Sequence, residues 1–162
     1  MNREEIVFLR EDVPLIRKRT RPGQTRLTLH DDGSLAWFSS PGMEEEGGWL
    51  YHGFSTRLGG VSSGETGTMN MTYAREKSAA NVTENYRRIA GSIGFEPEKM
   101  VFSAQTHTVN VRKVTAQDAG YGFVEERPYH DIDALMTDVP GITLVIFSAD
   151  CVPLLIADKA HR

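Results

Sequence analysis

The chain has 162 residues, of which 40% are hydrophobic, 25% charged and 9% aromatic. These proportions are typical of a folded soluble protein, and they exclude intrinsic disorder, collagen-like repeats and coiled coils. Eighteen basic residues stand against 22 acidic ones, a formal net charge of -4, so we expect no nucleic-acid or membrane partner. The length favours a single domain spanning residues 1–162, with a hydrophobic core of its own.

Residues 1–50 are predicted to form a β-rich segment, and residues 51–162 carry the motifs described below. Residues 27–38 predict a hairpin, because two apolar runs flank the turn residues Asp31, Asp32 and Gly33. A further strand is predicted over residues 49–54.

A helix is predicted over residues 78–93, where apolar side chains recur at helical spacing. Gly94 suits the left-handed stop of that helix. A strand is then predicted over residues 100–114, and its period of two would place Gln105 and His107 side by side on one face. The continuous apolar run at residues 143–147 is typical of a strand buried on both faces.

Cys151 follows Asp150 directly after this last strand, where α/β sheets often place reactive groups. A thiolate there is a candidate metal ligand or nucleophile. The alternative is a buried cysteine that acts as a small apolar residue. As the single cysteine, it excludes an internal disulfide and, with no targeting signal in the sequence, favours a reducing cytoplasm.

His107 lies in Gln105-Thr106-His107 within the predicted strand. A histidine fixed there would be well oriented for metal binding or proton transfer. A hydrogen-bonded structural histidine is the competing interpretation.

A glycine-rich segment, residues 54–64, contains Arg57, whose guanidinium could hold phosphate or carboxylate by two hydrogen bonds. Its spacing matches neither the phosphate-loop nor the dinucleotide fingerprint, so an exposed arginine in a glycine turn is the alternative. Asn70 offers an amide near the end of the same loop. Asp131 and Asp133 are either an acid/base pair or acids that face water before a strand.

The order of these motifs resembles that of the YfiH/PgeF family, once called multicopper polyphenol oxidoreductases (laccase domain). The resemblance covers roughly residues 52–157. It is carried by the following segments in chain order: Ser55-Thr56-Arg57, Gly59-Gly60-Val61-Ser62, Met69-Asn70-Met71, Gln105-Thr106-His107, Asp133-Ala134-Leu135 and Ala149-Asp150-Cys151-Val152-Pro153.

The resemblance implies an α+β fold of stacked mixed β-sheets with flanking helices. It also implies a zinc-dependent purine nucleoside enzyme that cleaves adenosine, inosine and methylthioadenosine with phosphate and deaminates adenosine. Bacterial members of the family are linked to peptidoglycan editing.

The implied zinc ligands are His107 and Cys151, with a third histidine in a His-Ala-Gly-Trp motif. That motif is absent from this sequence and His161 does not match it, so we expect the third ligand beyond Arg162 in a longer protein, of which this piece alone would be poorly active. Arg57 would hold phosphate. Asn70 and Gln105 would contact the nucleoside, and Asp150 would orient the site from behind the ligands.

Two other functions remain open from the sequence. Cys151 and His107 could be the nucleophile and base of a metal-free cysteine hydrolase. Alternatively, the chain is a scaffold that binds a nucleoside or a partner without turnover. A copper oxidase is disfavoured, because one cysteine and no histidine-rich pattern make a poor copper site.

Overall fold

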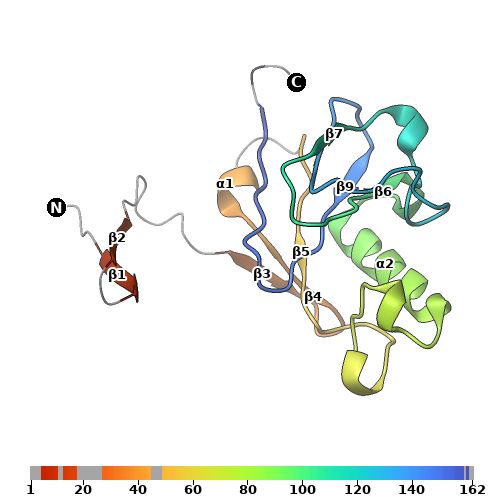
Figure 1. Cartoon of the computed structure of the whole chain (residues 1–162). Helices are drawn as coiled ribbons and strands as arrows, with labels where there is room; N and C mark the ends of the chain where they lie inside the picture. The colour runs from red at the N-terminus through yellow and green to blue at the C-terminus, as the bar shows by residue number, and fades with distance from the viewer. Residues whose placement is uncertain (1–4, 11–12, 18–26, 45–48, 159, 161–162) are drawn as a thin grey trace.

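The computed structural model describes residues 5–10, 13–17, 27–44, 49–158 and 160, and Figure 1 traces the chain. His161 and most of the basic cluster at residues 17–26 lie outside the described residues. Within the described ranges, no helix is long and apolar enough to cross a membrane.

Several small sheets and few helices make up the structure, which confirms the expected mixed α/β architecture. The strands are β1 (Glu5–Arg10), β2 (Val13–Arg17), β3 (Thr28–Asp31), β4 (Ala36–Ser39), β5 (Phe54–Ser55), β6 (Met100–Phe102), β7 (Val111–Lys113), β8 (Ala134–Met136) and β9 (Thr143–Val145). The helices are α1 (Pro41–Glu44), α2 (Ala79–Ile93) and the 3-10 turns η1 (Gly64–Thr66), η2 (Tyr73–Arg75), η3 (Pro97–Lys99) and η4 (Ala116–Asp118). Strands β1–β2 and β3–β4–β5 pair antiparallel, whereas β6–β9 and β7–β8 pair parallel.

The predicted hairpin is confirmed as β3 and β4. The strand predicted over residues 49–54 is wrong, because only Phe54 and Ser55 pair with β4. At the next ladder position, the backbone N–H of Ser40 donates to the ring Nε2 of His52 at 2.8 Å instead of to a strand carbonyl. A side chain therefore replaces the backbone partner, and the strand stays short.

The predicted helix is confirmed as α2, and Gly94 ends it in the left-handed conformation at φ 98°. Helix α2 joins two parts of the core. Val82 and Tyr86 pack against Met100 and Phe102 of β6. Ile89 packs in a second cluster with Leu35 of the β3–β4 turn and with Met69, which follows the glycine-rich segment. The helix thereby connects the β3–β4–β5 sheet to the β6–β9 sheet (Figure 1).

Strand β6 is buried on both faces. Met100 and Phe102 face α2, and Val101 packs on the other side against Val114 and Tyr129. All three strand residues are at most 4% exposed. A strand covered on both faces is a rigid base for the loop that follows it.

The single strand predicted over residues 100–114 is wrong. Strands β6 and β7 are separate, and residues 103–110 form a loop between them. His107 has a φ of 66°, outside the strand region. Gln105 and His107 therefore do not share a strand face, and their period-of-two pattern has no structural counterpart.

The buried amide of Asn85, on α2, holds the glycine-rich loop. Its Oδ1 accepts the N–H of Val61 at 2.8 Å, and its Nδ2 donates to the carbonyl of Asn70 at 2.8 Å and to Ser62 Oγ at 3.1 Å. Glycine is required at position 60 because the backbone of Thr68 lies close to it: an added Cβ would be 2.0 Å from the carbonyl oxygen of Thr68. The shape of the loop thus depends on a helix side chain and on glycine at close-packed positions.

Replacing Asn85 by alanine should lower the free energy of unfolding by about 3 kcal/mol, because buried backbone groups of the loop lose their partners. Urea titration measures this loss, and hydrogen exchange should show faster exchange of the Val61 amide. The exposed Arg87→Ala on the same helix is the control, with an expected change within about 0.5 kcal/mol. Equal midpoints for the two variants would contradict the anchoring role.

Asp118 is buried at the end of η4 and closes a capping box with Thr115. Arg112 donates to its Oδ1 at 2.5 Å, and the guanidinium of Arg112 lies 4.5 Å from the centre of the Tyr129 ring. Desolvation raises the pKa of Asp118, but the hydrogen bonds from Thr115 and Arg112 outweigh it and hold that pKa below its ordinary value.

Because the pKa of Asp118 is lower in the folded state, its contribution to stability is present above the unfolded pKa, near 4, and is lost as the pH falls through the folded value. We expect Asp118→Asn to cost about 2 kcal/mol at pH 7 and progressively less below pH 4. Urea midpoints measured from pH 7 to pH 2 test this, with Glu98→Gln as the control. A constant deficit at all pH values would refute the assignment.

Candidate functional site

The site is built where β6 and β9 end. The two strands are parallel neighbours in the register Met100 to Thr143 and Phe102 to Val145, so the chain leaves both at the same end of the sheet. The Ser103 amide continues the ladder by donating to the carbonyl of Val145 at 3.0 Å. The segments that carry His107 and Cys151 therefore start side by side.

Gln105 links these two segments. Its Nε2 donates to the carbonyl of Phe147 at 2.9 Å, and its Oε1 accepts the Phe147 N–H at 2.7 Å and the Ser103 hydroxyl at 2.8 Å. The Gln105 side chain occupies the backbone N–H and C=O of Phe147, so these groups are not available to a strand ladder. Strand β9 therefore ends at Val145, and it is shorter than the strand predicted over residues 143–147. The residues of β9 are half-buried and not, as predicted, buried on both faces. The nucleoside contact expected of Gln105 has to compete with this link.

His107 lies exposed on the loop that follows Gln105. A left-handed φ costs a non-glycine residue about 1 kcal/mol or more, so a compensating interaction must hold it. The Asp133 carboxylate supplies that interaction, with Oδ1 accepting the His107 N–H at 2.8 Å and Oδ2 accepting the Thr106 N–H at 3.0 Å. The hydrogen bond from the Thr106 amide is the largest cause that lowers the pKa of Asp133.

Cys151 is an exposed free thiol six residues after β9, so the interpretation as a buried apolar residue is wrong. The hydroxyl of Ser148 donates to the carbonyl of Cys151 and closes a turn around it. Asp150 is also exposed, and its carboxylate makes no hydrogen bond to another described residue. Its expected orienting role stays a prediction.

Arg57 is exposed, and one of its guanidinium nitrogens donates to the carbonyl of Gly67 at 3.2 Å. The N–H groups of Gly60 and Val61 are used within the loop and by α2, and a bound anion would therefore meet the guanidinium rather than these amides. Asn70 is buried and bonds both backbone groups of Thr72, at 3.1 and 3.2 Å. The nucleoside role predicted for Asn70 therefore competes with its role in the loop.

The donor chemistry of His107 and Cys151 fits zinc, which takes imidazole nitrogen and thiolate sulfur. Both side chains are exposed, and the thiol is free. Among the described residues, no group of three or more histidine, cysteine or acidic side chains is placed to hold a metal.

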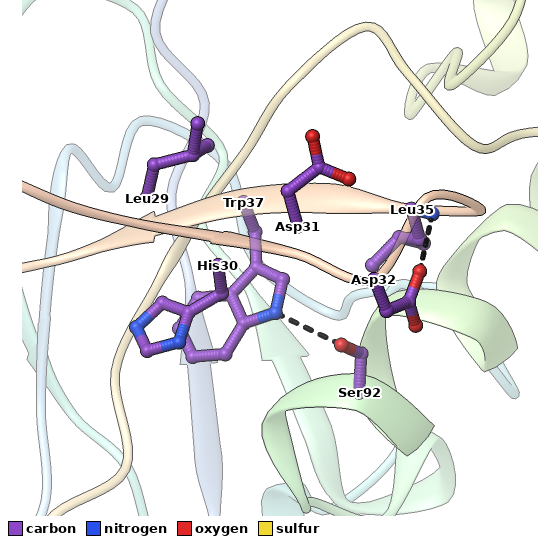
Figure 2. Close-up of a pocket in the computed structure, with 7 residues that line it drawn as sticks. All are labelled: Leu29, His30, Asp31, Asp32, Leu35, Trp37 and Ser92. Atoms are coloured by element: carbon purple, nitrogen blue, oxygen red, sulfur yellow. Dashed lines mark hydrogen bonds between the residues drawn. The ribbon is translucent and has the colours of Figure 1, made fainter.

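A hollow on another part of the surface lies between the β3–β4 hairpin and the end of α2, lined by residues including His30, Trp37 and Ser92 (Figure 2). The His30 ring stacks on Trp37 with centres 3.9 Å apart, and the indole N–H of Trp37 donates to Ser92 Oγ at 2.9 Å. None of the predicted site residues lines this hollow. The hollow is the place where the β3–β4 hairpin packs against α2.

Two residues anchor loops in ways that the sequence did not predict. Asn85 interrupts the apolar face of α2 between Val82 and Tyr86, and this polar residue in an apolar stripe was a readable signal. Asp133 was considered only as an acid/base or solvated residue. Its partners lie 25 to 27 residues earlier in the chain, a separation at which local sequence carries no signal.

Comparison with known proteins agrees with the motifs. Residues 51–162 match the family described as multi-copper polyphenol oxidoreductase laccase. The purine nucleoside phosphorylase of Deinococcus radiodurans is 39% identical over 107 residues, which cover 66% of this chain and 38% of the relative. The purine nucleoside phosphorylase YlmD of Geobacillus stearothermophilus is 33% identical over 125 residues, covering 69% of this chain and 45% of the relative.

Two solved structures share the fold. The hypothetical protein YfiH of Bacillus licheniformis superposes with a TM-score of 0.66 at 24% identity, covering 76% of this chain and 45% of that one. YlmD of Geobacillus stearothermophilus gives a TM-score of 0.63 at 27% identity, covering 78% and 46%. The chain spans less than half the length of these relatives. The motifs, the fold and the match over residues 51–162 together show that the chain belongs to the multi-copper polyphenol oxidoreductase laccase family.

Proposed function

We propose that the whole protein is a zinc-dependent purine nucleoside phosphorylase that also deaminates adenosine. The observation that carries the proposal is the parallel pairing of β6 with β9, which starts the His107 and Cys151 segments at one end of a sheet. The names of the relatives supply the substrate class, a purine nucleoside with phosphate. The family's description mentions copper, but zinc suits one thiolate and one imidazole on a chain with no other cysteine.

His107 and Cys151 would hold the metal, with the third ligand of the family's His-Ala-Gly-Trp motif outside this sequence. Zinc held there would supply Lewis-acid activation of water for the deamination. The Gln105 link between the two segments supports this, because it would set the spacing of the two loops that carry the ligands. Asp150 would orient the site through Cys151, the residue next to it.

For phosphorolysis, Arg57 would hold phosphate against the sugar. A phosphate oxygen attacks the anomeric carbon, the bond from that carbon to the purine nitrogen breaks, and the base leaves with the bonding electrons and takes up a proton. The chain's contribution is positioning: the guanidinium would orient the phosphate dianion for attack on the anomeric carbon.

Replacing Cys151 or His107 by alanine in the full-length protein should remove bound zinc and lower both phosphorolysis and deamination at least 100-fold, because each loses a ligand. Metal analysis of the purified protein and chromatography of the released bases and of inosine measure these losses. His130→Ala, which removes another exposed histidine, is the matched control and should keep metal and turnover.

Retained turnover in Cys151→Ala would overturn the zinc assignment. Activity that survives chelators but not alkylation would instead identify a metal-free cysteine hydrolase. Saturable nucleoside binding without product would identify a binding scaffold.

Arg57→Ala should raise the KM for phosphate about tenfold or more, because a charge-assisted hydrogen bond contributes roughly 1.5–3 kcal/mol. The phosphate KM of Arg57→Lys should fall between those of Arg57→Ala and the unaltered protein, since a lysine keeps the charge but not the two-pronged geometry. Initial rates at varied phosphate and fixed adenosine measure the effect, and Arg87→Ala on the outer face of α2 is the control. An unchanged phosphate KM would remove Arg57 from the substrate site.

A further inference from the structure

The loop that carries His107 is held by one carboxylate. Three donors from three consecutive residues converge on Asp133: the N–H groups of Thr106 and His107, at 3.0 and 2.8 Å, and the hydroxyl of Thr108 at 3.1 Å. This convergence fixes the loop at the residue before His107, at His107 itself and at the residue after it.

Asp133 is itself held in place. Its backbone N–H donates to the carbonyl of Asn110 at 3.1 Å, directly before β8 begins. On the other side, Ala104 and Ile132 form an isolated antiparallel bridge. The carboxylate therefore projects from backbone that is tied to both ends of the loop.

Asp131 supports the same loop from the neighbouring position. Its Oδ2 accepts from the side-chain amide of Asn110 at 2.8 Å, and the hydroxyl of Thr106 donates to its other oxygen. The two acids thus bind parts of the loop, and neither has the other as a hydrogen-bond partner among the described contacts. This arrangement does not suit a pair that shares a proton.

We infer that Asp133 is a positioning residue, which holds the backbone of His107 in its left-handed conformation and so sets the direction of the imidazole. The inference rests on the proposed function in taking His107 as a metal ligand. Removal of the Asp133 carboxylate frees the loop to adopt ordinary backbone conformations. The loop then no longer holds the imidazole in the orientation for metal binding. Metal affinity and kcat should fall, while the KM for phosphate, which depends on Arg57, should not change.

The test uses Asp133→Asn in the full-length protein, because asparagine keeps the shape and replaces one acceptor by a donor that faces the loop's own donors. Zinc affinity, measured by competition with a chromogenic chelator, should weaken 10- to 100-fold. The phosphate KM should stay within twofold. Asp138→Asn is the matched control, since Asp138 is an exposed acid that bonds only Lys113 among the described residues. It should bind zinc like the unaltered protein.

Amide hydrogen exchange of the unaltered protein gives a second readout that needs neither zinc nor turnover. The Thr106 and His107 amides should be protected, and Asp133→Asn should speed their exchange at least tenfold. Unprotected amides would overturn the inference, as would unchanged zinc affinity with a lost kcat, which is the mark of an acid/base residue. If the unaltered protein binds no zinc, the proposed function fails while the exchange data still decide the role of Asp133.

Discussion

The whole arrangement depends on the burial of β6. Its three residues are covered by α2 on one face and by Val114 and Tyr129 on the other, so the strand cannot shift without opening the core. Its parallel partner β9 and the loop after Phe102 take their positions from it. The segments that carry His107 and Cys151 are irregular and exposed, but they start from β6 and from its parallel partner β9.

An amide or carboxylate side chain organises each irregular segment. Asn85 holds the glycine-rich loop, Gln105 joins the β6 and β9 exits, and Asp133 holds the His107 loop. In all three cases the side chain bonds backbone groups of the segment that it holds. The loops are thereby ordered without forming strands or helices.

Local signals in the sequence predicted part of the local structure. The hairpin β3–β4 and helix α2 were predicted because turn residues and helical periodicity lie within a few residues of each other. The alternation of apolar and polar residues over 100–114 predicted one long strand. The segment instead forms two short strands, β6 and β7, and a loop whose amides bond Asp133. Pairing between β6 and β9, more than 40 residues apart, had no local signal, and the order of motifs identified the family without revealing the geometry that joins them.

Asp133 and Asn85 recognise the main chain more than side chains, and this has a consequence for how the sequence can change. Backbone N–H and C=O groups are the same whatever residue carries them. Val61, which Asn85 holds only through its backbone N–H, is therefore free to mutate in size and polarity while the curve of its loop is kept. Selection can then retune what the loop surfaces present to a small molecule without rebuilding the scaffold beneath them.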